Sequence, residues 1–98
     1  MFYEWDEAKR ASNLEKHGLD FIDADLVLES SCVQIVDSPR DGQARQQAFA
    51  YVFGQLRVLT VVFVPGEGRC RIISFRSAKR NEREAYHAWL EKDDRSDH

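Results

Sequence analysis

The sequence predicts an α+β domain with two N-terminal helices, a four-stranded antiparallel meander sheet and a C-terminal helix. Three observations support this fold class: capped helical segments open the chain, four strand-like runs separated by turn residues follow, and an amphipathic segment closes it. Helices that are segregated from an antiparallel sheet pack on it as two layers. With 98 residues, the chain is expected to form one domain over residues 1–98.

A short strand and two helices account for the first thirty residues. Residues 2–5 form a short predicted strand, and Asp6 can cap a helix that runs to about His17. Gly18 stands where a left-handed residue commonly ends a helix. A second, shorter helix is predicted over 20–29, beginning at a capping aspartate. The residues that it should bury are Phe21, Ala24 and Leu28, with Val27 at the margin of this face.

Apolar and β-branched runs in the middle of the chain predict four strands. These are Val33–Asp37, Gln47–Phe53, Leu56–Val64 and Cys70–Arg76. Gly54-Gln55 has the spacing of a two-residue hairpin turn, and Pro65–Gly68 has the composition of a longer hairpin loop. The polar segment Ser38–Arg45 is expected to be an exposed loop.

A final helix is predicted over residues 78–91, with Ser77 as its N-cap. One face of this helix carries the apolar residues Ala78, Ala85, Tyr86, Trp89 and Leu90. A core tyrosine is the simpler interpretation of Tyr86, although its hydroxyl can also serve a nearby site. The acidic tail 91–98 is expected to fray.

Composition excludes several classes of protein. A hydrophobic content of 43% excludes a disordered chain, and no apolar run approaches the roughly 18 residues of a membrane span. The first residues do not resemble a secretory signal, so we expect a cytoplasmic protein.

Cys32 and Cys70 should be reduced. No glycine-rich phosphate loop, Ser-His-Asp order or metal-spaced cluster is present, and no cofactor or metal is expected.

The charge is unevenly distributed along the chain. The net charge is −3, and residues 1–30 carry three bases against eight acids. Residues 69–90 carry six bases against two acids. Because local potential decides what a surface attracts, this later region is predicted to bind an anion.

Polar residues line one side of the first predicted helix. Lys9, Asn13, Lys16 and His17 fall within an arc of about 100° at helical spacing. Two interpretations remain open. The stripe is either a solvated face that ends in a histidine near the helix dipole, or a cationic surface whose imidazole contacts phosphate or transfers a proton.

The junction between the last strand and the last helix is the stronger candidate for an anion site. Its cations are Arg76, Lys79 and Arg80, with Arg83 one turn later. Each cation at a helix N-terminus costs about 0.3–1 kcal/mol, so this cluster is favourable only when an anion sits among the free N–H groups. The alternative is an exposed face on which Glu82 and Glu84 pair with neighbouring bases.

Strand alternation adds a constraint on the arginines of the last strand. In a regular strand, Arg71 and Arg76 point to opposite faces and cannot both enter one groove. A bulge would re-aim one of them. We expect Arg76 to contact phosphate and Arg71 to be secondary.

Two motifs of this chain resemble a known family. The opening motif is Phe2-Tyr3-Glu4-Trp5-Asp6-Glu7-Ala8-Lys9, followed by Asn13, Lys16-His17-Gly18-Leu19 and Phe21. The closing motif is Ile72-Ile73-Ser74-Phe75-Arg76-Ser77-Ala78, followed by Arg80, Glu82, Arg83 and Tyr86. Both motifs resemble those of the BrnT-type toxins of bacterial toxin–antitoxin modules, and the resemblance spans roughly residues 2–90.

The resemblance implies a RelE-like fold and a ribonuclease that blocks translation. It implies as partner a cognate antitoxin with a ribbon-helix-helix DNA-binding domain, in a two-plus-two complex that reaches operator DNA only through the antitoxin. It also implies metal-independent RNA cleavage by the ribose 2′-hydroxyl. The catalytic candidates carried over by position are Lys16, His17, Arg76, Arg80, Glu82 and Tyr86.

Roles for these candidates follow from what the reaction needs. Arg76 and Arg80 would stabilise the charged phosphorane, Lys16 or His17 would act as base, and Tyr86 would act as acid. Glu82 would orient the cations. The expected further phosphate contacts are Arg71, Lys79, Arg83 and Lys9. The alternatives are an antitoxin-binding protein with little or no nuclease activity and a non-catalytic nucleic-acid-binding module.

Overall fold

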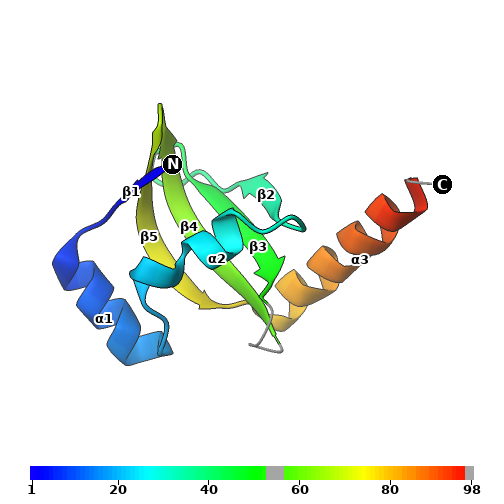
Figure 1. Cartoon of the computed structure of the whole chain (residues 1–98), viewed down its shortest axis with the longest axis horizontal. Coiled ribbons are helices and arrows are strands. Elements are labelled where there is room, and N and C mark those ends of the chain that lie inside the picture. The colour runs from blue at the N-terminus through cyan, green and yellow to red at the C-terminus, as the bar shows by residue number, and fades with distance from the viewer. Residues whose placement is uncertain (53–56, 97–98) are drawn as a thin grey trace.

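Five strands form one sheet in the order β1-β5-β4-β3-β2 (Figure 1). The structure is a computed structural model that describes residues 1–52 and 57–96. The strands are β1 (Phe2–Glu4), β2 (Gln34–Asp37), β3 (Gln46–Tyr51), β4 (Val58–Gly66) and β5 (Arg69–Ser77). The helical elements are α1 (Glu7–His17), the 3₁₀ turn η1 (Phe21–Asp23), α2 (Asp25–Leu28) and α3 (Arg80–Ser96). The predicted α+β class is confirmed.

The predicted sheet was wrong in one respect, because β1 joins it as a fifth strand. β1 runs parallel to β5, with Phe2 opposite Arg69 and Glu4 opposite Arg71, so the sheet is mixed. The remaining pairs are antiparallel, as the meander predicts. Periodicity identifies a strand but does not identify a partner from the other end of the chain, and for this reason the pairing was missed.

Three smaller boundaries also differ from the prediction. The second N-terminal helix is split into η1 and α2. Ser77 ends β5 and does not cap α3, which begins at Arg80. The Glu82 carboxylate instead accepts a hydrogen bond from the Lys79 backbone N–H at 2.7 Å, one half of a capping box. The helix continues through Ser96, beyond the predicted end at 91. The predicted Gly54-Gln55 turn lies outside the described residues.

The two faces of the sheet are covered very differently (Figure 1). On one face, η1 and α2 enclose the main core, whose largest buried side chains are Phe21, Val27, Leu59, Ile72 and Phe75. On the other face, α3 packs near one end of the sheet through Tyr86, Trp89 and Leu90. There the fully buried Tyr86 donates a hydrogen bond to the Cys32 carbonyl at 2.8 Å and accepts one from the Tyr51 N–H at 3.3 Å. The C-terminal part of α3 projects away from the sheet.

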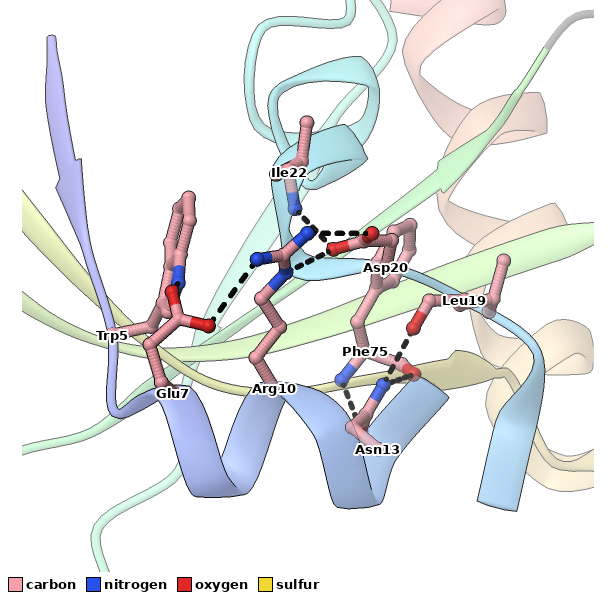
Figure 2. Close-up of polar contacts among 8 residues, drawn as sticks. All are labelled: Trp5, Glu7, Arg10, Asn13, Leu19, Asp20, Ile22 and Phe75. Atoms are coloured by element: carbon pink, nitrogen blue, oxygen red, sulfur yellow. Dashed lines mark hydrogen bonds and ion pairs between the residues drawn. The ribbon is translucent and has the colours of Figure 1, made fainter. Parts of the chain in front are cut away.

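Helix α1 attaches to the sheet through a buried polar residue (Figure 2). Asn13 donates from Nδ2 to the Phe75 carbonyl at 2.8 Å and to the Leu19 carbonyl at 3.0 Å, and its Oδ1 accepts from the Phe75 N–H at 3.1 Å. Leu14, on the apolar side of the helix, is 42% exposed. The side of α1 that carries Asn13 therefore faces β5. For Asn13, the interpretation of the polar stripe as a solvated face is wrong.

An ion pair fixes the return of the chain after α1 (Figure 2). The Arg10 guanidinium binds both carboxylate oxygens of Asp20, at 2.7 and 3.1 Å. Asp20 also accepts from the Ile22 N–H at 3.1 Å and so caps η1, as predicted. Because a bidentate pair restricts orientation, α1 and η1 are held at a defined angle.

We expect Asn13→Ala to lower the free energy of unfolding by roughly 2–3 kcal/mol, because it leaves the Phe75 N–H and two carbonyls without partners in a buried position. Urea denaturation monitored by circular dichroism measures this change. Asn81→Ala, which removes an exposed amide, is the matched control and should stay within about 0.5 kcal/mol of the parent. Equal losses in both variants would contradict the anchoring role of Asn13.

Candidate functional site

Two adjoining pockets hollow the part of the molecule where α1, β5 and the β2–β3 hairpin meet. The helix-side pocket, of about 380 Å³, lies between α1 and β5. The hairpin-side pocket, of about 350 Å³, lies between that hairpin and the end of β5. Ile73 and Ser74 line both pockets and form their shared wall. We refer to the two pockets together as the groove.

The described lining of the groove is strongly cationic, although the whole chain is acidic. Its basic residues are Lys9, Lys16 and His17 on the helix side and Arg40, Arg45, Arg76 and Lys79 on the hairpin side. No aspartate or glutamate is found among the described lining residues. A concave surface with one sign of charge concentrates counter-ions, so the groove is suited to an anionic ligand.

A β-bulge brings Arg76 to the groove. The pairing of β4 with β5 shifts register between Val62, which faces Ser74, and Phe63, which faces Ile72. As a result Ile72 and Phe75 both enter the main core although they are three residues apart. Arg76 follows Phe75 and therefore points to the face opposite the main core, where it meets Glu82 of α3. By the same alternation Arg71 shares this face, but it is exposed and lines neither pocket.

Glu82 holds the guanidinium of Arg76 in a fixed orientation. Nη1 and Nη2 of Arg76 lie 2.8 and 3.1 Å from the two carboxylate oxygens of Glu82, and Nη1 also donates to the Ser77 carbonyl at 3.1 Å. Glu82 accepts further hydrogen bonds from Gln47 Nε2 and the Lys79 N–H. The Arg76 guanidinium lowers the pKa of Glu82 to about 2. Glu82 is therefore ionised at neutral pH and positions Arg76.

His17 is the titratable group of the helix-side pocket. It occupies the last turn of α1, where Gly18 adopts the left-handed conformation (φ 70°) and ends the helix, as predicted. Partial burial lowers the pKa of the imidazole, and the positive charges of Lys16 and Arg76 lower it further. At neutral pH the ring is therefore mainly uncharged, and it can accept a proton.

The structure separates the remaining candidates into two groups. Lys9 and Lys16 line the helix-side pocket, and Lys79 lines the hairpin-side pocket. The candidates outside the groove are Arg71, Arg80, Arg83 and Tyr86. Arg80 pairs with Glu84 at 3.2 Å on the exposed side of α3, and Arg83 donates to the Ala78 carbonyl at 3.1 Å. The Tyr86 hydroxyl makes its hydrogen bonds to the backbone of Cys32 and Tyr51, so Tyr86 is a core residue, which is the simpler of the two interpretations given above.

Two groove residues, Arg40 and Arg45, received no site role in the sequence analysis. They lie in the segment predicted as an exposed loop, where neither helical nor strand periodicity indicates a direction. The structure shows that the segment is a tight hairpin, with φ of 53° at Asp41 and 77° at Gly42. An Asp-Gly pair flanked by strands was the available signal for this turn.

Within residues 1–52 and 57–96, no group of three or more His, Cys, Asp or Glu side chains is arranged to hold a metal ion. None of the helices described by the structure is both long and apolar enough to cross a membrane.

We expect Glu82→Gln to lower the free energy of unfolding by roughly 2 kcal/mol at pH 6, because it weakens charged hydrogen bonds to Arg76. Since the pKa of Glu82 is depressed to about 2, its contribution is complete above its ordinary pKa of 4.5 and is lost as pH falls toward 2. Urea denaturation at pH 6 and pH 2.5 should show a smaller difference from the parent at the lower pH. Glu84→Gln, at an exposed pair, is the control; an equal effect there would contradict this role of Glu82.

The comparison with protein families identifies the chain. The family described as "Ribonuclease toxin, BrnT, of type II toxin-antitoxin system" matches residues 5–82, which include α1, the strands β2 to β5, and Glu82. A comparison with curated proteins gives no match. Because the family match covers most of the chain, it also carries the general expectation of a protein antitoxin as partner. The chain belongs to the BrnT family of ribonuclease toxins of type II toxin–antitoxin systems.

Proposed function

We propose that this toxin cleaves RNA by attack of the ribose 2′-hydroxyl on the adjacent phosphate, with the reaction centred on the shared wall of the groove. The observation that supports the proposal is that His17 lines one of the two adjoining pockets and Arg76, whose guanidinium Glu82 holds, lines the other. His17 and Arg76 lie close enough for the charge of Arg76 to lower the pKa of His17. A proton acceptor beside a permanent cation is what this reaction needs.

Each step has a candidate group in the helix-side pocket or at its border. His17 accepts the proton of the 2′-hydroxyl as the 2′-oxygen attacks phosphorus. Arg76 stabilises the negative charge that develops on the phosphorane oxygens. The bond from phosphorus to the 5′-oxygen then breaks, with Lys16 as the candidate donor of a proton to the leaving oxygen. The products are a 2′,3′-cyclic phosphate and a 5′-hydroxyl.

The other predicted residues take outer roles in this proposal. Lys9 and Lys79 line the groove and would contact phosphates beside the scissile one. Arg71, Arg80 and Arg83 lie outside it and would contribute only to the long-range attraction of RNA. We do not assign Tyr86 as the acid, because its hydroxyl already donates to the Cys32 carbonyl.

The biological context is also part of this proposal and is supported by the membership of the chain in a type II toxin–antitoxin family. Cleavage of messenger RNA would block translation until the cognate antitoxin binds. We propose that this antitoxin carries a ribbon-helix-helix domain and forms a two-plus-two complex that reaches operator DNA through the antitoxin alone.

We expect Arg76→Ala and His17→Ala each to lower the cleavage rate at least 100-fold, because one removes charge stabilisation and the other removes the base. Cleavage of a fluorescent RNA by the purified proteins measures this loss, and growth with RNA integrity after induction provides a second readout. His87→Ala removes an exposed histidine of α3 and should leave the rate unchanged.

The same experiment distinguishes the alternatives. If the folded parent cleaves no RNA but binds its antitoxin, the chain is a binding protein with little nuclease activity. Tight, salt-dependent RNA binding without cleavage would instead favour a nucleic-acid-binding module.

The dependence of cleavage on pH tests the role of His17. Because its pKa lies below the ordinary 6.5, the parent rate should rise with pH through a midpoint below 6.5 and be level near neutrality. This rise in the cleavage rate reports deprotonation of the His17 imidazole, which can act as a base only when it is uncharged. Cleavage rates of the parent and of His17→Ala are measured from pH 4.5 to 8. The rise in rate with pH should be present in the parent and absent from the residual activity of the variant. A rise with the same midpoint in both proteins would assign the base to another group.

A further inference from the structure

The hairpin-side pocket contains two arginines, Arg40 and Arg45, to which the proposed function gives no role. Arg40 and Arg45 come from the β2–β3 hairpin, and Lys79 comes from the segment before α3. Ser38, Gln47 and Ser74 add polar groups to the same lining. Cations supplied by two separate parts of the chain converge on one pocket of about 350 Å³.

The hairpin holds its two arginines in place. Arg40 and Gln43 exchange backbone hydrogen bonds of 3.1 and 2.9 Å across the Asp41-Gly42 turn, and the Ser38 N–H donates to the Arg45 carbonyl at 2.9 Å. The positive φ angles at both central residues are those of the turn that matches the twist of paired strands. The arginines therefore stand on a hydrogen-bonded scaffold.

The guanidinium of Arg45 is oriented but not saturated. Its Nε donates to the Gln43 side chain at 2.7 Å, which restricts its rotation. Within the described part of the chain, its Nη1 and Nη2 groups have no hydrogen-bond partner. Guanidinium N–H pairs of this kind bind phosphate oxygens in a bidentate manner.

Nearby acids do not neutralise this pocket. Asp37 and Asp41 belong to the same hairpin but are absent from the described lining, and Asp37 accepts from Gln46 at 3.3 Å. Glu82 is engaged by Arg76, Gln47 and the Lys79 N–H. The charge on Arg40 and Arg45 is therefore available to a ligand.

The position of the pocket identifies the ligand. It meets the helix-side pocket at Ile73 and Ser74, so a chain whose phosphate lies beside His17 and Arg76 can continue directly toward the hairpin. A polyanion with regularly spaced phosphates fits two adjoining cationic pockets better than a single anion does.

We propose that Arg40 and Arg45 bind a second phosphate of the RNA chain, on the hairpin side of the scissile one. This proposal rests on the proposed ribonuclease function. It means that the enzyme prefers RNA longer than a dinucleotide, since a dinucleotide contains only the scissile phosphate.

The test compares two RNA lengths in the Arg40→Ala/Arg45→Ala double variant. Cleavage of an octanucleotide should fall about tenfold in kcat/KM, whereas cleavage of a dinucleotide should stay within about twofold of the parent. Binding of a 2′-O-methyl octanucleotide, which cannot be cleaved, should lose about 0.7 from its salt slope for each phosphate contact removed. Arg57→Ala/Arg69→Ala removes the same charge at exposed sites outside the groove and serves as the control.

The outcomes separate this proposal from the proposed function. An equal loss in the control, or an equal loss for both RNA lengths, would overturn the second phosphate site. If the parent cleaves neither RNA, the nuclease assignment fails; the phosphate site still stands if the double variant, but not the control, weakens binding of the 2′-O-methyl octanucleotide. A parent that neither cleaves RNA nor binds the 2′-O-methyl octanucleotide overturns both proposals.

Discussion

The reciprocal hydrogen bonds between the Asn13 amide and the backbone of Phe75 determine where the first helix lies. β1 accompanies β5 only as far as Arg71, and in the part of the chain that the structure describes no strand lies beside the edge of β5 at Phe75. The Asn13 side chain takes the place of that strand. Because hydrogen bonds of a buried amide are directional, they specify the helix position more tightly than apolar contact would. Lys16 and His17, one turn later, are consequently held beside the groove.

A single carboxylate organises the opposite side of the groove. Glu82 accepts hydrogen bonds from Gln47 on β3, from Arg76 on β5 and from the Lys79 N–H at the start of α3. Three elements are thereby joined at one point. Since the charge of Glu82 offsets that of Arg76, the net positive potential of the groove depends on the lysines and on the hairpin arginines. In the proposed reaction, orientation at the scissile phosphate and attraction of the RNA are therefore supplied by different residues.

Local sequence patterns predicted the structural features that depend on neighbouring residues. They did not predict the features that depend on contacts between distant segments of the chain. Capping residues located α1 and η1, and apolar, β-branched runs separated by turn residues located the strands of the meander. The parallel pairing of β1 with β5, the bulge at Ile73 and the direction of Arg45 all depend on partners elsewhere in the chain. For the same reason His17 and Arg76 could be chosen as candidates from sequence motifs, whereas their placement on two sides of one groove required the structure.

The pairing of the first strand with the last has a consequence for folding during synthesis. Asn13 and Phe75 are 62 residues apart in the sequence. Likewise, β1 cannot pair until β5 has been synthesised. Long-range contacts of this kind form late, after the entropy of closing the intervening chain has been overcome. His17 therefore leaves the ribosome long before the strand that completes its pocket. Until β5 has left the ribosome the groove does not exist, so the toxin acquires its proposed activity only after Arg69–Ser77 has been synthesised.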